Sequence, residues 1–185
     1  DLGLSIETIQ QDDSLPTGQV VVTVGDNNEP SFDIIAPAAW DAISTKSLKR
    51  ITNEKYHLIY GTLAQRSEIS REAIRSLWDD ADITFYDVNL RPPFTPQETV
   101  LQSLAAADVV KLNDTELQKV ADWSDIAPGS LEERAQTFFA QYNLLALAVT
   151  LGESGAFVVS NNGLYEHPGF PTKVADTVGA GDAFF

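Results

Sequence analysis

Short apolar runs recur along most of the chain, separated by stretches whose apolar positions repeat with the period of a helix. Four runs are apolar throughout rather than alternating, which is typical of strands covered on both faces. They span 58–60, 83–88, 109–112 and 144–150. Between Ser70 and Ala81 the apolar positions form one helical stripe. This alternation predicts a doubly wound, mostly parallel α/β sheet flanked by helices.

The helices between these strands have recognisable starts. In Thr95-Pro96-Gln97-Glu98, we expect Thr95 to be the N-cap and Pro96 the first helical residue. Ser130-Leu131-Glu132-Glu133 has the spacing of a capping box, in which the cap hydroxyl and the glutamate each bind the other residue's backbone N–H. Both segments therefore predict helices that begin immediately after them.

Two hairpins are also predicted. Strands at 19–24 and 31–35 flank the turn residues 25–28, and strands at 156–159 and 164–167 are joined across Asn161-Asn162-Gly163. A two-stranded hairpin alone is marginally stable in water. We therefore expect the first hairpin to lean on the main domain, on a ligand or on a second subunit.

Composition restricts the classes of partner. The 185 residues suffice for one domain with at most a small appendage, and a net charge of −15 disfavours nucleic acid and anionic membrane surfaces. No apolar run approaches the length of a membrane span. With no cysteine there are no disulfides or thiolate metal sites, which fits a cytoplasmic protein. The opening Asp-Leu-Gly and the absence of methionine suggest an internal portion of a longer protein.

Polar residues follow several of the apolar strands. Ligands of open α/β sheets bind beyond the carboxyl ends of the strands, so these positions are the candidate site. The segments are Asp87-Val88-Asn89-Leu90-Arg91, Lys111-Leu112-Asn113-Asp114-Thr115-Glu116, Thr150-Leu151-Gly152-Glu153-Ser154-Gly155 and Gly179-Ala180-Gly181-Asp182.

The last segment has the chemistry of a phosphate loop. Small residues let the backbone approach a ligand, and the N–H groups that open a helix attract negative charge. A carboxylate beside a phosphate is unfavourable unless it acts there, and Asp182 could accept the proton of an attacking hydroxyl. The alternative is an ordinary glycine-rich turn with an aspartate in the first helical turn.

The sequence resembles the ribokinase, or PfkB, family of carbohydrate kinases. Asp176-Thr177-Val178-Gly179-Ala180-Gly181-Asp182 is similar to the family's Asp-Thr-x-Gly-Ala-Gly-Asp signature. The other three segments resemble its Asp-x-Asn-x-Arg, Asn-x-x-Glu and Thr-x-Gly-x-x-Gly elements. Pro16-Thr17-Gly18 and Ala39-Trp40-Asp41 resemble the fructokinase-like branch.

This resemblance implies a ribokinase-like fold with a small β-sheet lid over the sugar. Residues 1–15 would end a preceding α/β segment, 16–36 would form the lid, and 37–185 would form a kinase core that is incomplete at both ends. It also implies ATP-dependent phosphorylation of a sugar primary hydroxyl, with fructose as the first choice and Mg²⁺ as the metal. A homodimer through the lid would be consistent with the hairpin's need for support.

The resemblance assigns roles to residues. Asp182 would be the general base, Gly179, Ala180 and Gly181 the anion hole, and Arg91 a cation for phosphate or substrate oxygens. Asn89 and Arg91 would contact substrate, and Lys111 is a similar candidate. The nucleotide side would comprise Asn113, Glu116, Thr150, Gly152 and Gly155. Glu116 would hold Mg²⁺ through water, and Asp176 would bind a monovalent cation such as K⁺.

Other interpretations stay open. Asn113 and Glu116 also fit a helix capping box, Thr150 to Gly152 fit a strand exit, and Arg91 fits a surface position. We assign no chemistry to the histidines His57 and His167. Ribose, 2-keto-3-deoxygluconate and nucleosides are alternative substrates, and a catalytically silent sugar-binding relative is another reading. A dinucleotide-binding oxidoreductase would require Gly-x-Gly-x-x-Gly after a strand, which is absent.

Overall fold

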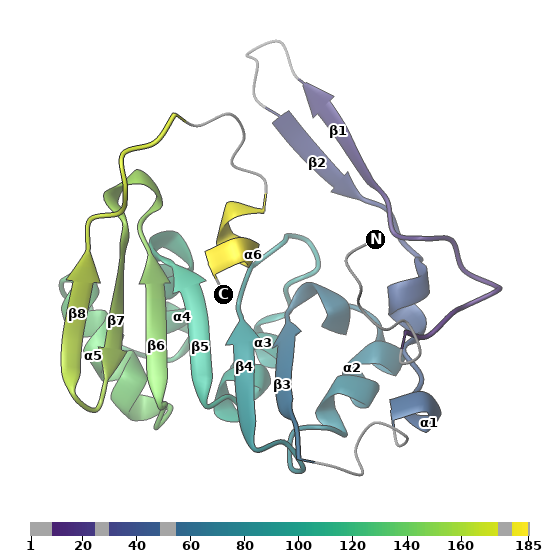
Figure 1. The fold of residues 1–185 in the computed structure, drawn as a ribbon, viewed down its shortest axis with the longest axis horizontal. Coiled ribbons are helices and arrows are strands. Elements are labelled where there is room, and N and C mark those ends of the chain that lie inside the picture. The colour runs from purple at the N-terminus through teal and green to yellow at the C-terminus, as the bar shows by residue number, and fades with distance from the viewer. Residues whose placement is uncertain (1–8, 25–29, 49–54, 174–178, 185) are drawn as a thin grey trace. The chain divides into compact units, whose positions relative to one another are not determined.

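A computed structural model of the chain describes residues 9–24, 30–48, 55–173 and 179–184. The chain forms two compact units (Figure 1). The first comprises Asp1–Lys55 and Ala64–Asp80, and the second comprises Tyr56–Leu63 and Ala81–Phe185. The domain boundaries expected from the sequence, after residues 15 and 36, stay predictions.

The first unit contains the early hairpin. Strands β1 (Val20–Val24) and β2 (Pro30–Ile34) pair antiparallel, with Val20 opposite Ile34. The predicted strands are confirmed to within one residue, and the turn at 25–28 lies outside the described residues. Val20, Val21 and Val22 are each about half exposed, so neither face of β1 is buried.

Short helices complete this unit: η1 (Ala39–Ala42), α1 (Thr45–Leu48), η2 (Leu63–Gln65), whose first residue falls in the second unit, and α2 (Glu68–Arg75). Ser67 caps α2 by accepting the N–H of Ser70. The helix starts and ends earlier than the stripe at 70–81 suggests. After Arg75 the N–H groups of Leu77 and Trp78 bond three residues back, which tightens the chain into turns.

The second unit is built on a six-stranded sheet. Its strands run in the order β3-β4-β5-β6-β7-β8, the first four parallel and the last two antiparallel. Their bounds are β3 (His57–Gly61), β4 (Ile83–Asp87), β5 (Val109–Asn113), β6 (Ala146–Thr150), β7 (Ala156–Ser160) and β8 (Gly163–His167). The mostly parallel sheet and the second hairpin are confirmed. Strand order in the described sheet follows the chain, so the doubly wound order stays a prediction.

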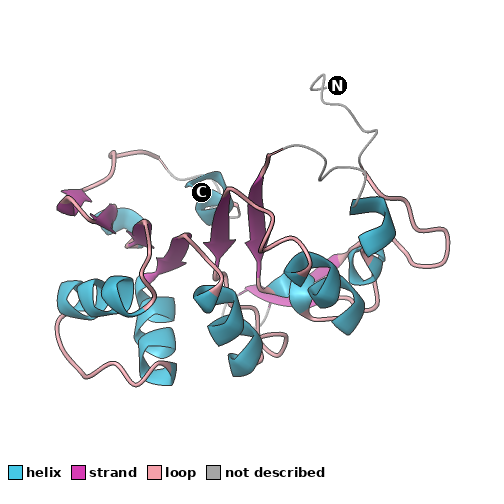
Figure 2. Ribbon diagram, turned by 90° about the horizontal axis from the view of Figure 1, so that it is seen from below, coloured by secondary structure: helices cyan, strands magenta, loops and turns pink. Residues whose placement is uncertain are grey.

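Three helices lie along one side of this sheet (Figure 2). They are α3 (Gln97–Ala105), α4 (Asp114–Trp123) and α5 (Leu131–Gln141). Helix α4 contacts β5 and β6, and α5 contacts β6 and β7. The fully buried side chains of Leu117, Val120, Phe138, Leu147 and Val149 form the core between them. No helix in the described part of the chain has the length and apolar character of a membrane span.

The helix starts were predicted with one error. Ser130 and Glu133 form the expected capping box before α5, with reciprocal contacts of 3.2 and 2.9 Å. At α3, however, the N-cap is Pro96 rather than Thr95, and the first helical residue is Gln97. The extended ψ of 127° at Pro96 places it outside the helix, although its carbonyl accepts the N–H of Val100.

Candidate active site

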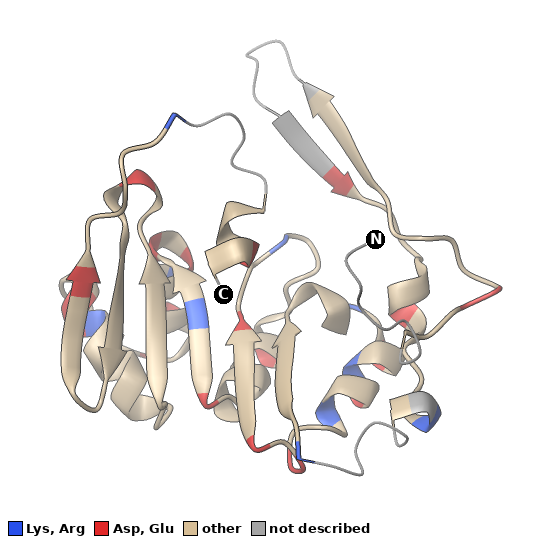
Figure 3. Ribbon diagram, viewed as in Figure 1, with Lys and Arg blue, Asp and Glu red and all other residues tan. Residues whose placement is uncertain are grey.

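A buried ion pair joins the ends of the central strands β4 and β5. Asp87 and Lys111 are neighbours in the strand register, and the Lys111 Nζ lies 3.1 and 3.2 Å from the two carboxylate oxygens. Both side chains are largely buried, at 13% and 6% exposed respectively. In Figure 3 the basic band on β5 lies beside the acidic end of β4. Burial raises the pKa of Asp87 above its ordinary value, while the Lys111 ammonium opposes this rise.

Glu116 ties two neighbouring loops together. Asn113 caps α4, where its Oδ1 accepts the Glu116 N–H at 2.8 Å and its own N–H donates to Glu116 Oε2 at 3.0 Å. The other oxygen, Oε1, accepts the N–H of Leu90 at 2.6 Å. The buried carboxylate therefore fixes the loop after β4 against the start of α4. The capping-box interpretation of Asn113 and Glu116 is correct as geometry.

These contacts bear on a magnesium site. Each Glu116 oxygen accepts a backbone N–H and has a second lone pair left. Within the ranges that the structure describes, no group of three or more histidine or acidic side chains could hold a metal directly. Magnesium commonly keeps several waters and few protein ligands. The residues thus fit the predicted contact through water better than a cage of direct ligands.

The chain's last described segment meets the loop that follows β4. Gly179 has a φ of +78°, and the short helix α6 (Ala180–Phe184) follows it. Asp182 lies in its first turn with an exposed side chain. Its Oδ1 accepts a hydrogen bond from the Asn89 Nδ2 at 3.4 Å. Two segments that lie far apart in the sequence are therefore in contact at the candidate base.

Gly181 lies directly over the buried lysine. A Cβ built at this position would be 3.1 Å from the Lys111 Nζ, tighter than ordinary van der Waals contact. The lack of a side chain thus lets α6 approach the ion pair. Asp182 is also close enough to raise the pKa of Asp87 slightly further. Segments 87–91, 111–116 and 179–182 therefore converge.

Arg91 has no part in this convergence. Its side chain is exposed, and its Nη1 is 3.4 Å from the carbonyl oxygen of the preceding Leu90. Arg91 belongs to the same loop as Asn89, and the geometry assigns it no phosphate or sugar contact. Its role stays a prediction.

The fourth predicted segment follows β6, whose Thr150 pairs in register with Asn113 of β5. The turn η3 (Gly152–Ser154) comes next, with φ of +59° at Gly152 and +91° at Gly155. A Cβ at Gly155 would lie 2.0 Å from the His167 carbonyl oxygen, so packing alone requires glycine there. The strand-exit interpretation is therefore sufficient to explain Gly155, and a nucleotide role stays a prediction.

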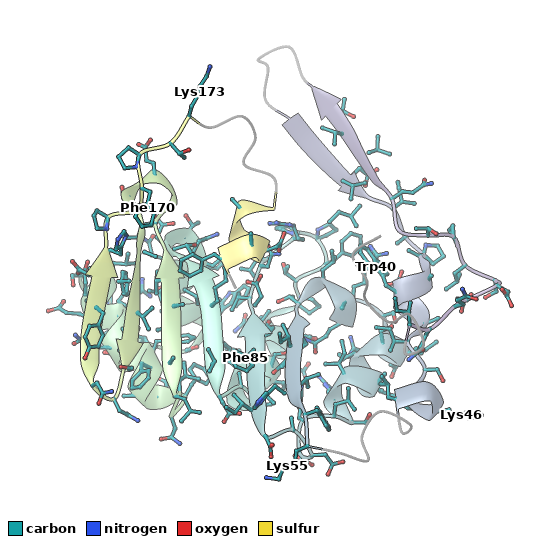
Figure 4. The ribbon with its side chains drawn as sticks, viewed as in Figure 1. Trp40, Lys46, Lys55, Phe85, Phe170 and Lys173 are labelled. Atoms are coloured by element: carbon teal, nitrogen blue, oxygen red, sulfur yellow. The ribbon has the colours of Figure 1, made fainter. Side chains whose placement is uncertain are left out.

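Sequence reasoning did not foresee an apolar cavity beside this turn. It has a volume of about 590 Å³ and is lined by residues of η3, β7, β8, α6 and the loop after β8, including Gly152, Tyr165, His167, Phe170 and Phe184. Phe170 is 84% exposed, and its ring centroid lies 4.8 Å from that of His167 (Figure 4). The only sequence signal was an aromatic residue in a loop flanked by prolines, which by itself is weak.

Comparison with known proteins decides the family. The profile of the pfkB family carbohydrate kinases matches residues 1–185. The chain belongs to this family.

Relatives within and around the family are similar over nearly the whole chain. A fructokinase of Escherichia coli is 28% identical over 194 residues, covering 98% of this chain and 61% of that protein. A fructokinase from Vibrio cholerae O395, crystallised in a fructose, ADP and calcium ion bound form, is 28% identical with a TM-score of 0.76, covering 94% and 57%. An aminoimidazole riboside kinase from Salmonella enterica, at 22% identity, TM-score 0.78 and coverage of 98% and 60%, shares the fold.

This pfkB chain spans about three fifths of the length of the curated relatives it matches, with 61% and 60% of two fructokinases covered.

Asp176 of the signature lies outside the described residues. His57 and His167 are exposed, and the His167 Nδ1 accepts the N–H of Gly169 at 3.0 Å. Asp87 was missed as the partner of Lys111, although an acid ending an apolar strand is a usable signal.

Proposed function

We propose that the protein is a sugar kinase that transfers the γ-phosphoryl group of ATP to a primary hydroxyl, with fructose as the first substrate. The observation that carries this proposal is the convergence of Asp182 with Asn89 and with the Lys111 pair at the carboxyl ends of β4 and β5. Ligands of open α/β sheets bind at such ends. An exposed carboxylate there is suitably placed for proton transfer.

Asp182 would act as the general base. Its Oδ1 accepts the Asn89 amide, which leaves Oδ2 to accept the proton of the sugar hydroxyl as its oxygen attacks phosphorus. Helix α6 begins at Ala180, and the Ala183 N–H donates to the Gly179 carbonyl at 2.9 Å, so the N–H groups of Ala180, Gly181 and Asp182 come before this first helical bond and have no acceptor within the helix. Those donors would receive the charge that develops on the phosphoryl oxygens.

The nucleotide would lie along the neighbouring loops. Thr150 ends β6, and Gly152 and Gly155 follow it. The cavity of about 590 Å³ beside them has aromatic walls against which the adenine ring of ATP could pack. Asn113 and Glu116 lie at the start of helix α4, which follows the adjacent strand β5. Magnesium, when bound, neutralises phosphate oxygens, and Glu116 would hold its waters. Asp176 would bind a monovalent cation such as potassium.

The first hairpin supports a lid role. Valines of β1 are about half exposed on both faces, as expected for a sheet that closes over a ligand or against a second subunit. Closure would exclude water from the reaction and limit hydrolysis of ATP. The Vibrio cholerae fructokinase in its fructose and ADP bound form supports this choice of substrates.

The test uses the whole protein with Mg²⁺-ATP and a panel of fructose, ribose, 2-keto-3-deoxygluconate and a nucleoside. We expect turnover with fructose to exceed the others. Asp182→Asn should lower kcat by about 10²- to 10⁴-fold, the usual contribution of a general base, while ATP binding measured by calorimetry persists.

A matched control is Asp125→Asn, which changes an exposed aspartate at the end of α4. This control should keep wild-type turnover. Substantial turnover by Asp182→Asn would remove the base from its role. Sugar binding without any ATP turnover would favour a silent relative.

A further inference from the structure

Asn89 has an unusual backbone conformation for its place in the fold. The described non-glycine residues with positive φ are Asn89 at 34°, Asp125 at 57° and Asn143 at 52°. Asp125 and Asn143 follow α4 and α5, where helices commonly end in the left-handed region. Asn89 follows strand β4 instead. A conformation of this kind persists only where the surroundings enforce it.

Contacts on both sides of Asn89 enforce it. The Val88 N–H donates to the Lys111 carbonyl at 3.0 Å, and the Val88 carbonyl accepts the hydroxyl of Thr62. On the other side, the Leu90 N–H donates to the buried Glu116 carboxylate at 2.6 Å. Asn89 is therefore held between two anchored residues, and its side chain is directed by fixed backbone rather than by a free loop.

The side chain so directed meets Asp182. A carboxylate only accepts hydrogen bonds, so the amide nitrogen of Asn89 must be the group facing it, at 3.4 Å from Oδ1. Engaging one oxygen limits rotation of the carboxylate and leaves the other oxygen available. Asn89 is half-buried and held between anchored neighbours, whereas Asp182 is exposed.

We propose that Asn89 is a positioning residue that orients the Asp182 carboxylate for proton abstraction. This inference rests on the proposed kinase function and gives Asn89 a task other than contact with the sugar. The Glu116 carboxylate contributes to this positioning, because it accepts the N–H of Leu90, the residue next to Asn89. Charged groups around Asp182 are Asp87, Lys111 beneath Gly181, and Glu116 beyond Asp87.

Three substitutions separate the amide from the backbone. Asn89→Ala removes the amide, Asn89→Gly removes the amide but relieves the positive φ, and Asn89→Asp places a second carboxylate beside the base. We expect Asn89→Ala and Asn89→Gly to lower kcat about 10- to 100-fold, as misplacement of a reacting group does, with KM for ATP and sugar within about threefold. In Asn89→Asp a second carboxylate repels the Asp182 carboxylate instead of donating a hydrogen bond to it, so kcat should fall at least as far as in Asn89→Ala.

Asn143 supplies the matched control, since it has the same residue type and a similar φ at the opposite end of the sheet, before β6. Asn143→Ala, Asn143→Gly and Asn143→Asp should leave kcat unchanged. Wild-type kcat in Asn89→Gly would reduce Asn89 to a backbone role and overturn the proposal. A raised sugar KM with unchanged kcat would do so too, by making Asn89 a sugar contact.

A readout without turnover keeps the two proposals distinguishable. In carbon-13 NMR spectra of the whole protein at one fixed pH, the Asp182 carboxyl signal should shift in Asn89→Ala, which removes its hydrogen bond, and should not shift in Asn143→Ala. An inactive wild type would defeat the kinase proposal alone, and the NMR comparison would still decide the contact. An Asp182 carboxyl signal that is unchanged in Asn89→Ala would overturn the positioning role.

Discussion

Substitution of Lys111 by methionine tests the buried pair that supports the site. Methionine keeps most of the apolar stem and removes only the charge, so Asp87 would be left buried without its cation. The two side chains are 6% and 13% exposed, and the ammonium contacts both carboxylate oxygens at 3.1 and 3.2 Å. Breaking a buried pair by removing one partner costs about 3–5 kcal/mol.

The loss should depend on pH in a defined direction. Burial raises the pKa of Asp87, and the Lys111 ammonium is the largest influence that lowers it, so Lys111→Met should raise this pKa further. A carboxyl with a raised folded pKa stabilises the fold at low pH and loses that contribution as pH rises through the folded value. The loss of unfolding free energy in Lys111→Met should therefore be largest near neutral pH and become smaller as the pH is lowered.

Urea denaturation at pH 7.5 and pH 5 measures both effects. With an m-value of about 2 kcal/mol/M, a loss of about 4 kcal/mol lowers the midpoint by about 2 M. The double variant Asp87→Asn with Lys111→Met removes both charges, and it should recover much of the loss because replacing a whole buried pair is often neutral. A midpoint shift below about 0.5 M that is independent of pH would refute the reasoning.

Two further predictions concern stability. Gly155→Ala should lower the free energy of unfolding by about 3 kcal/mol or more, because a Cβ would lie 2.0 Å from a backbone oxygen. Gly163→Ala, at φ +121° with no atom within 4 Å, should lower it by only about 1–3 kcal/mol through backbone strain. Thermal unfolding of the two variants measures the difference. Asp41→Asn should destabilise the first unit at pH 7, because the hydrogen bond from Arg66 holds the pKa of Asp41 below its ordinary value. That contribution is present above the unfolded pKa and lost as pH falls through the folded one, so urea midpoints of variant and wild type should converge as pH falls below the ordinary range of a carboxyl group, and a constant gap would contradict this assignment.

The sheet was predictable from sequence because its strands are apolar enough to be recognised locally, although α3, α4 and α5 lie along one side of it and the uninterrupted apolar runs had suggested cover on both faces. Every run of the expected sheet became a strand, with ends shifted by about two residues at most, as at 144–150 against Ala146–Thr150. Helix ends were less predictable. Pro96 fits the preference for a first helical residue rather than that for an N-cap, and only the observed ψ shows that it lies outside the helix.

The site was predictable as a set of loops but not as a set of contacts. The sheet rule selected the segments that contain Asn89, Lys111 and Asp182, which do converge. Nothing local in the sequence indicates that Glu116 binds the Leu90 N–H, because that contact spans 26 residues. Arg91 follows a buried strand with an exposed side chain, and its expected contact with phosphate or substrate stays a prediction.

The order of the six strands has a consequence for how the protein is made. From β4 to β8, each strand of the described sheet pairs with the strand synthesised just before it. Contacts between neighbours in sequence cost less loop-closure entropy than distant ones, and they favour rapid folding. The sheet can thus be extended strand by strand during translation, with the ion pair between β4 and β5 in place before the glycine segment that will rest on it has left the ribosome.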